Sequence, residues 1–331
     1  MLPQFRQQAV GLQSNSDRLI ATRHQSRFRD VLTINIQMNK LIGILLIIIS
    51  AASFGTLAIF GRYLYADGMD TFTVLFLRFT IAALLMIVLL AIRRESLPRG
   101  KVLLQLIGMG ALGYVGQSFS YMTAIKYASA GLVALLLYLY PMFVAILSTI
   151  FLKEKFTLIK ILVLALATFG AALTANPEGG AWTGIVLAIT AAGIYSIYII
   201  VGTGVMKQVS PIQSSTVIFA SAGAVYGGLT ALSGAHFPQT GAGWAAVGAI
   251  VIVATVIPVA TFLAGLQRIG PTNASMLSTL EPVVTVLLSA MLFGDLLKPI
   301  ILAGGLLILI AVIILARSEI SLNTEHPLAG H

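Results

Sequence analysis

The amino-acid sequence predicts an all-α polytopic membrane protein with ten transmembrane helices, arranged as two inverted five-helix repeats. Three observations predict this fold: the composition, ten apolar segments of spanning length, and a match of the chain to itself at one fixed offset. Hydrophobic residues make up 58% of the 331 residues and charged residues 9%, with a mean hydropathy of +0.98. Ordinary soluble domains contain about a quarter charged residues. The composition therefore excludes a soluble protein, and the lack of cysteine excludes disulfides and thiolate metal sites.

Each predicted span must satisfy its backbone hydrogen bonds internally and needs about 20 apolar residues to cross about 30 Å of hydrocarbon. The first segment, Leu41 to Gly61, has 21 residues and no acidic or basic side chain. The ten predicted spans are 41–61, 71–92, 102–124, 129–152, 158–175, 181–203, 213–233, 242–266, 271–294 and 298–316. The boundaries are marked least clearly in the stretch from Gln208 to Gln267, so nine spans are the alternative count.

The distribution of basic residues predicts the orientation. With ten spans both termini lie on one side, and short loops rich in Lys and Arg face the cytoplasm. Most basic residues fall on the side of the N-terminus, whereas Arg62, Lys126 and Lys298 fall in loops on the other side. We therefore predict a multi-pass protein of a bacterial inner membrane with both termini in the cytoplasm. The net charge of +9 follows from this topology, and we expect no nucleic-acid partner.

The two ends of the chain differ from the rest in composition. Residues 1–40 are polar and contain no apolar run, so we expect a disordered cytoplasmic tail, and residues 317–331 form a second cytoplasmic tail. A signal peptide is not expected, because the first apolar run is long enough to span the membrane. Met38-Asn39-Lys40 stands directly before this run, which suggests the hypothesis that the native protein starts at Met38 and that the first 37 residues do not belong to it.

An internal repeat appears when the chain is shifted by 141 residues. This shift places Tyr140-Pro141 over Glu281-Pro282 and Glu154 over Asp295, without a gap. The two repeats cover residues 41–175 and 181–316, with five spans each. An odd number of spans forces the second copy to enter the membrane from the opposite face. Inverted repeats are typical of alternating-access carriers, with the substrate near the midplane; the alternative is an ordinary ten-helix bundle of duplicated ancestry.

Three prolines are predicted to interrupt the spans. Pro141 and Pro282 occupy equivalent positions in the fourth and ninth spans, and Pro258 lies in the eighth. Proline removes a backbone donor and disturbs the preceding turn. Symmetric helix breaks indicate the binding site of a carrier, so we predict gating roles here. The alternative is that they are static kinks that fit the bundle.

Two ionisable residues, Arg78 and Glu281, fall inside predicted spans and away from their ends, where they are costly and usually face a cavity or a partner. Glu281 is expected to bind a substrate ammonium or to take up a proton, and Ser278 lies one turn before it. The structural alternative is a protonated acid bonded to another helix. For Arg78 we expect snorkelling or pairing with Asp67 or Asp70; the alternative is a structural partner or a partner for a substrate carboxylate.

Polar and aromatic side chains near mid-depth complete the predicted site. Those on the third span recur at i, i+3, i+4 and i+7, which places them on one face of an α-helix. Aromatic faces with hydroxyl tips suit a substrate with an apolar or aromatic side chain, but the hydroxyls could instead bond neighbouring helices. The predicted substrate-binding residues are Tyr114, Gln117, Ser118, Tyr121, Tyr138, Tyr140, Tyr195, Tyr198, Ser278 and Glu281.

Several short segments resemble the drug/metabolite transporter superfamily, EamA type, over residues 41–316. In the first half these are Ala124 to Gly131, Tyr140-Pro141 and Leu152 to Thr157; in the second they are Leu266 to Pro271, Glu281-Pro282-Val283 and Phe293-Gly294-Asp295. Asp295 stands where the family usually has glutamate, which keeps the charge. The resemblance implies gradient-driven export of small metabolites such as amino acids.

The predicted function is therefore a secondary transporter that exports a small metabolite by alternating access, with a passive channel as the alternative. Coupling to protons and a monomeric state are expected, and no cofactor or metal is expected. Enzymatic activity is not expected, because the four histidines, His24, His236, His326 and His331, all lie outside the predicted spans.

Overall fold

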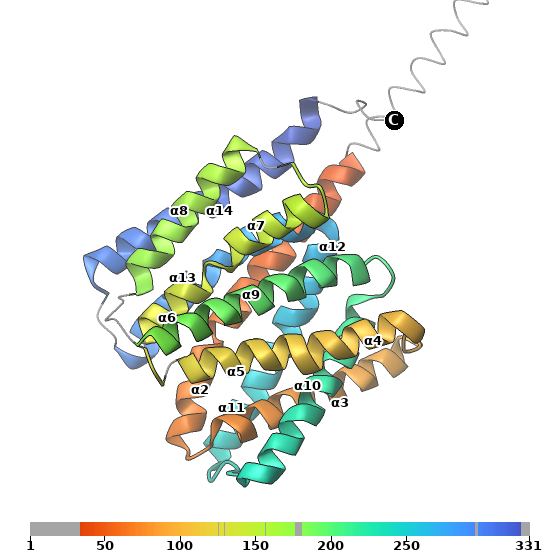
Figure 1. Ribbon diagram of the computed structural model, residues 1–331, viewed down its shortest axis with the longest axis vertical. Helices are drawn as coiled ribbons and strands as arrows, with labels where there is room; N and C mark the ends of the chain where they lie inside the picture. The colour runs from red at the N-terminus through yellow and green to blue at the C-terminus, as the bar shows by residue number, and fades with distance from the viewer. Residues whose placement is uncertain are drawn as a thin grey trace, which may run out of the picture.

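The computed structural model describes residues 34–124, 126–128, 130–155, 157–175, 181–294 and 297–325. In these ranges the chain forms helices and no β-strand, which confirms the all-α prediction (Figure 1). Of the predicted tails, residues 34–40 and 317–325 belong to the first and last helices, while 1–33, 326–331, Asp295 and the connection at 176–180 lie outside the described residues.

Eight helical segments among the described residues are long and apolar enough to cross a membrane, which supports a multi-pass bundle. The number falls short of ten for two reasons. One segment, Gly241–Phe293, has 53 residues and covers both the eighth and the ninth predicted spans, while the apolar helix Leu158–Leu173 is shorter than the 18 residues required. The count of ten therefore stays a prediction.

The helices follow one another in the order of the predicted spans. The first half contains a helix over 34–55, then α2 (Leu57–Ala66), α3 (Thr71–Ile92), α4 (Gly100–Gly108), η1 (Met109–Tyr114), α5 (Val115–Ala124), α6 (Ala130–Leu137), α7 (Tyr140–Phe151) and α8 (Leu158–Ala175). The second half contains α9 (Trp182–Val205), α10 (Pro211–Ser233), α11 (Gly241–Val251), η2 (Ile252–Val256), α12 (Ile257–Leu277), η3 (Ser278–Leu280), α13 (Glu281–Phe293) and α14 (Pro299–Glu325).

Equivalent helices of the two halves pack against each other. The most extensive helix contacts join α3 to α10 and α8 to α14, and Figure 1 shows both pairs side by side. These are the second span with the seventh and the fifth with the tenth. A two-fold axis between two repeats produces this self-pairing, so the contacts agree with an internal repeat.

The packing repeats in the register that the sequence predicts. A Cβ added to Gly184 would lie 2.7 Å from the Cβ of Ala128, so α9 and the end of the third span approach closely. The 141-residue shift relates Gly184 to Gly43 and Ala128 to Ile269. In this equivalent contact, a Cβ on Gly43 would lie 2.6 Å from Cγ2 of Ile269. The same pair of helices therefore meets at equivalent residues in both halves.

Both halves also interrupt their helices at equivalent places. α6 ends before a turn at 138–139 and α7 follows, while α12 gives way to the 3₁₀ turn η3 and then α13. Pro141 and Pro282 lie in the first turn of α7 and α13, where a missing backbone donor costs little. The third and eighth spans contain the π-helices η1 and η2, and Pro258 lies just after η2.

The long segment of the second half turns at Gly270, whose φ of 78° and ψ of 170° break the helix inside α12. Pro271 follows, and Thr272 donates a hydrogen bond of 2.5 Å to Oε2 of Glu154 from the connection between α7 and α8. A positive φ favours glycine, because a Cβ would clash there with the backbone. The turn coincides with the predicted boundary between the eighth and ninth spans.

Candidate functional site

A chain of aromatic ring contacts crosses the interior of the bundle. The Tyr140 and Tyr195 ring centroids lie 4.8 Å apart, those of Tyr195 and Tyr198 5.9 Å, and those of Tyr198 and Tyr114 5.7 Å. Tyr114 continues the chain to Phe79 at 5.2 Å. The rings come from α7, α9, η1 and α3, so the structure brings four of the predicted tyrosines together. Edge-to-face and offset stacking add to the energy of apolar burial.

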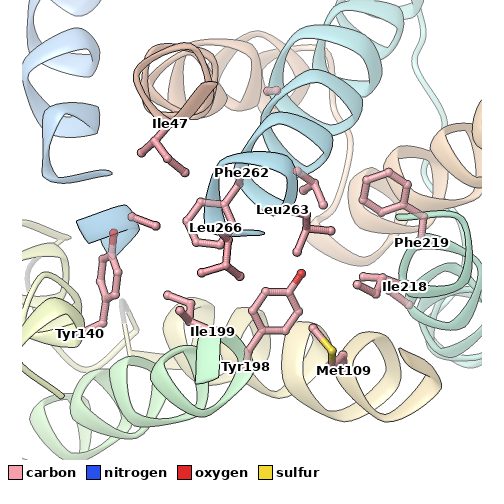
Figure 2. Close-up of a cluster of buried hydrophobic side chains, with 14 of the residues drawn as sticks. Ile47, Met109, Tyr140, Tyr198, Ile199, Ile218, Phe219, Phe262, Leu263 and Leu266 are labelled. Atoms are coloured by element: carbon pink, nitrogen blue, oxygen red, sulfur yellow. The ribbon is translucent and has the colours of Figure 1, made fainter. Parts of the chain in front are cut away.

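Figure 2 shows Tyr140 and Tyr198 in the buried cluster that α12 closes with Phe262 and Leu266. The Tyr140 side chain is 3% exposed, and its hydroxyl donates to the backbone oxygen of Ser275 over 3.3 Å. Its own backbone oxygen accepts a hydrogen bond of 3.1 Å from Ser196 on α9. Tyr140 therefore ties α7 to helices of the second half.

Glu281 opens α13 directly after the 3₁₀ turn and is half-buried. Five tyrosines of the bundle lie near enough to its carboxylate to interact with it electrostatically. These tyrosines are Tyr114, Tyr121, Tyr138, Tyr140 and Tyr195. Ser278 lies beside the Tyr140 hydroxyl and donates to Ala274 O over 2.9 Å. Most of the predicted site residues thus gather around Glu281.

Arg78 differs from its prediction. Its side chain is 4% exposed, and its Nε donates to Oγ1 of Thr255 over 2.5 Å while Nη2 donates to the backbone oxygen of Ala254 over 3.0 Å. Both acceptors belong to the π-helix η2. The expectation that Arg78 snorkels or pairs with Asp67 or Asp70 is therefore wrong. The physical reason is that a π-helix leaves polar backbone and side-chain groups available in the interior.

One of the predicted residues, Ser118, lies at a different place. Ser118 donates to Oε1 of Gln117 over 3.3 Å and lines a separate cavity of about 430 Å³ between α3, α5 and α10. Tyr226 lies at the same cavity, is 1% exposed, and its hydroxyl has no hydrogen-bond partner among the described residues. Sequence reasoning missed Tyr226, although a tyrosine in the middle of an apolar span is a usable signal. It also missed Thr255, for which only the nearby Pro258 gives a hint.

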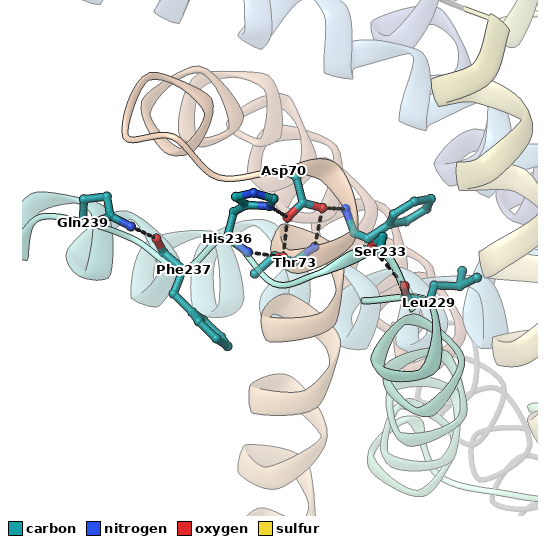
Figure 3. A network of polar contacts seen from close by, with 8 residues as sticks. Asp70, Thr73, Leu229, Ser233, His236, Phe237 and Gln239 are labelled. Atoms are coloured by element: carbon teal, nitrogen blue, oxygen red, sulfur yellow. Dashed lines mark hydrogen bonds and ion pairs between the residues drawn. The ribbon is translucent and has the colours of Figure 1, made fainter. Parts of the chain in front are cut away.

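The ends of the bundle are fixed by polar contacts between loops and helix caps. Asp70 caps α3 by accepting from the backbone nitrogens of Phe72 (2.8 Å) and Thr73 (3.1 Å) and from the Thr73 hydroxyl. His236 adds its Nδ1 at 3.3 Å from Asp70 and donates its backbone nitrogen to Thr73 over 3.1 Å (Figure 3). Partial burial raises the pKa of Asp70, but these hydrogen bonds together lower it by more than burial raises it. The pKa of Asp70 therefore lies below its ordinary value.

A second acid at this end acts in the same way. Asp67 accepts from the Thr240 hydroxyl over 2.7 Å and from the backbone nitrogen of Gln239 over 2.8 Å. The hydrogen bond from the Thr240 hydroxyl is the main reason that its pKa is lowered. At the other end, the Ser210 hydroxyl donates to Glu95 and Gln213 donates to the Ser96 backbone oxygen over 2.7 Å. The described residues contain no group of three or more acids or histidines that could hold a metal ion.

The amino-acid sequence is similar to that of known transporters. The chain matches the EamA-like transporter family twice, over residues 41–176 and 182–317. An uncharacterized transporter of Archaeoglobus fulgidus is 28% identical over 273 residues, which cover 82% of this chain and 95% of that protein. The uncharacterized transporter YcbK of Bacillus subtilis is 24% identical over 271 residues, which cover 76% of this chain and 86% of YcbK.

A solved structure described as "Crystal structure of protein" shares the fold, with a TM-score of 0.71 and 22% identity over 86% of this chain and 98% of that one. At this identity the likeness shows the fold alone. The family matches cover nearly all of the two predicted repeats and confirm the resemblance inferred from the sequence. The chain therefore belongs to the EamA-like transporter family and carries the family's domain twice.

Proposed function

We propose that this transporter is a secondary carrier that exports a small metabolite, such as an amino acid with an apolar or aromatic side chain, by alternating access. The observation that supports this most strongly is the gathering of tyrosines around Glu281, where helices of both halves are interrupted. The substrate would bind between the halves, near the middle of the bilayer. Carriers built from inverted repeats place their sites at such interruptions.

The repeated interruptions give the proposed motion a physical basis. Pro141, Pro258 and Pro282 each lie next to a change of helix type, from α to π or through a turn. Helices bend most easily where a backbone hydrogen bond is missing. We propose that bending here lets the two halves expose the site first to one side and then to the other. In this scheme one chain suffices for transport, so the carrier is a monomer. It lies in a bacterial inner membrane with both termini on the cytoplasmic side.

The lining suits an amino acid. The rings of Tyr114, Tyr195 and Tyr198 supply apolar faces with hydroxyl tips, and Glu281 supplies a carboxylate for an ammonium group or a proton. Gln117, Tyr121 and Tyr138 complete the set of substrate-binding residues that we propose, without Ser118, which lines the other cavity. Gradient-driven transport follows from proton uptake at Glu281 in this scheme.

Purified protein in liposomes tests the proposal. A carrier gives saturable flux that increases when substrate is present on the opposite side, whereas flux that rises linearly with the gradient would indicate a passive channel. Because the chain has no cysteine, single cysteines at Tyr114, Tyr138, Ser278 and Glu281 can be labelled without background. Protection of these positions by one metabolite among a panel would identify the substrate. If no polar reagent reaches any of the four, the proposed site is misplaced.

A further inference from the structure

The cavity between α3, α5 and α10 arises because the third span moves away from α10 after its π-helix. In η1, a Cβ added to Gly110 would overlap the side chain of Ser221 and the backbone oxygen of Ile218, so the two helices touch there. Beyond η1, α5 packs mainly against α9. The space left between α5 and α10 is the cavity of about 430 Å³, which lies within the range of about 300–1,000 Å³ that is usual for ligand sites.

One side of this cavity opens to the outer surface of the bundle. Phe119 lines the cavity and is 53% exposed, although it lies within the apolar helix α5 and not in a loop. Exposed apolar surface on a membrane-spanning helix contacts the acyl chains of lipids. Tyr65 and Lys126 also line the cavity and are exposed, and both residue types are common at the membrane–water interface. The opening therefore extends from the acyl chains to the headgroups of the bilayer.

Two polar groups in this cavity lack partners among the described residues. Tyr226 is 1% exposed, and its hydroxyl is not hydrogen-bonded. The ammonium group of Lys126 forms no ion pair with a carboxylate in the part of the chain that the structure describes. Burial of a hydroxyl without a hydrogen bond is costly, so the Tyr226 hydroxyl is suited to a ligand.

Asp70 also lines the cavity, but its carboxylate is already engaged. One oxygen accepts from the backbone nitrogens of Phe72 and Thr73, and the other contacts the Thr73 hydroxyl and the His236 ring (Figure 3). Asp70 is thus committed to the cap of α3. Lys126 is the charged group of the cavity that remains available to a ligand, and it attracts an anion.

The second half does not repeat these features. The 141-residue shift relates Lys126 to Gln267 and Tyr65 to Met206. The Gln267 amide donates to the backbone oxygen of Met206 over 2.9 Å, so the equivalent pair is tied together. Leu85 occupies the position equivalent to the tyrosine of the cavity and has no polar group. The cation and the buried hydroxyl are therefore features of the first half and not a consequence of the duplicated fold.

We infer that this cavity binds one anionic phospholipid, with its phosphate on Lys126 and an ester carbonyl oxygen on the Tyr226 hydroxyl. Tyr226 lies about two helical turns before the end of α10, deeper than Lys126, as ester groups lie deeper in a bilayer than phosphates. The acyl chains pass Phe119 into the surrounding lipid. A phospholipid suits the cavity better than a soluble anion, because apolar side chains such as Phe72 and Met122 form its walls. The site does not depend on the proposed transport function.

Three lipids test the two polar contacts. Delipidated protein in detergent would be titrated in native mass spectrometry with dioleoyl phosphatidylglycerol, with dioleoyl phosphatidylcholine, and with a dialkyl ether phosphatidylglycerol that lacks both carbonyl oxygens. We expect wild type to bind the anionic ester lipid about fivefold more tightly than phosphatidylcholine, because one lysine near the surface attracts the net negative charge. The ester lipid should also bind about fivefold more tightly than its ether analogue, through one hydrogen bond. Equal binding in either comparison overturns the inference.

Variants assign each preference to its residue. Lys126→Gln should lose the preference for phosphatidylglycerol over phosphatidylcholine and keep the preference for ester over ether, whereas Tyr226→Phe should do the reverse. Lys298→Gln is the matched control, since Lys298 is an exposed loop lysine away from the cavity, and it should keep both preferences. An equal loss in Lys126→Gln and Lys298→Gln would show attraction by surface charge alone and would overturn the inference, as would a Tyr226→Phe variant that still prefers the ester.

Folding and the source of the anion are checked separately. The melting temperature of Tyr226→Phe should equal that of wild type, because the hydroxyl has no partner among the described residues. A clear decrease would show that the hydroxyl serves the fold and would contradict the inference. Glycerol 3-phosphate carries the same phosphate without acyl chains. In large molar excess it should leave phosphatidylglycerol bound, and displacement of the lipid would assign the cavity to a soluble anion instead.

Discussion

The interruptions of the fourth and ninth spans have the same backbone design and different chemistry. In both, a new helix begins after a turn, with Tyr140-Pro141 in the first half and Glu281-Pro282 in the second. The backbone oxygens of Tyr140 and Glu281 each contact the first helix of the other repeat. Tyr140 O accepts from Ser196 over 3.1 Å, and Glu281 O lies 3.0 Å from a Cβ placed on Gly55, which is the equivalent of Ser196. The proline and the close packing therefore set the shape of the break.

The side chains at these two breaks differ in what they do. The Tyr140 hydroxyl has a backbone acceptor and is buried, whereas the Glu281 carboxylate is half-buried and faces a group of tyrosines. The same contrast holds between Arg78, which bonds the π-helix of the other half, and Phe219, which packs against Phe79 at 6.1 Å. The comparison teaches that duplication sets the backbone design of both breaks, whereas the side chains placed on that backbone differ between the halves.

The largest effect on transport is expected at Glu281, the charged residue at the interruption of the ninth span. Glu281→Gln should reduce transport by about 100-fold and abolish its dependence on a pH gradient, because the amide neither takes up a proton nor attracts an ammonium. Tyr140→Phe removes a polar group at the equivalent position and should cost less than about fivefold, since it loses one neutral hydrogen bond. Flux into liposomes with and without a pH gradient gives both values. A Glu281→Gln variant that keeps its pH dependence would reject the proton-coupling role.

The repeated close contacts should respond alike in the two halves. Gly43→Ala and Gly184→Ala each place a methyl group within 2.7 Å of a neighbour and should lower the free energy of unfolding by about 1–3 kcal/mol. Gly193→Ala in α9 is the control, because a Cβ there meets nothing within 4 Å. Thermal unfolding in one detergent measures all three. A tolerated Gly43→Ala beside a damaging Gly184→Ala would break the equivalence of the halves.

The smallest effect is expected at the helix caps. Asp70→Ala should lower stability by about 1 kcal/mol at neutral pH through the loss of the α3 cap. The pKa of Asp70 is lowered, so its contribution is complete above the ordinary carboxyl pKa and disappears as the pH falls through the lowered value. The stability difference between wild type and Asp70→Ala should therefore shrink only in acid. His236→Ala should matter less, because its ring is 63% exposed; a larger loss than for Asp70→Ala would contradict this order.

The helical segments and the register of the repeat could be predicted from the sequence, because apolar length and paired positions such as Pro141 and Pro282 are local signals. The separation of the polar residues of the third span into two places could not be predicted. Tyr114, Gln117, Ser118 and Tyr121 share a face only if the helix has 3.6 residues per turn throughout. Tyr114 instead ends the π-helix η1, whose wider turn shifts it relative to the residues in α5. Tyr114 therefore meets Tyr198, while Ser118 lines the separate cavity.

The partners of Arg78 were also beyond prediction, because they depend on how α3 packs against a π-helix far along the chain. Length and hydropathy predicted the eighth span but gave no sign that its backbone would free Ala254 and Thr255 as acceptors. The gathering around Glu281 was predictable in part, since mid-span tyrosines and a mid-span acid are rare and costly away from partners.

The central claim, that the two repeats have opposite orientations in the membrane, is tested most directly by labelling two equivalent loop positions. Ser96 and Phe237 are exposed and lie 141 residues apart. Because the chain has no cysteine, a single cysteine introduced at either position is the sole thiol of that variant. The account predicts that a membrane-impermeant maleimide labels Phe237→Cys in intact cells and labels Ser96→Cys only after the membrane is permeabilised. Labelling of both from the same side would contradict the inverted repeat.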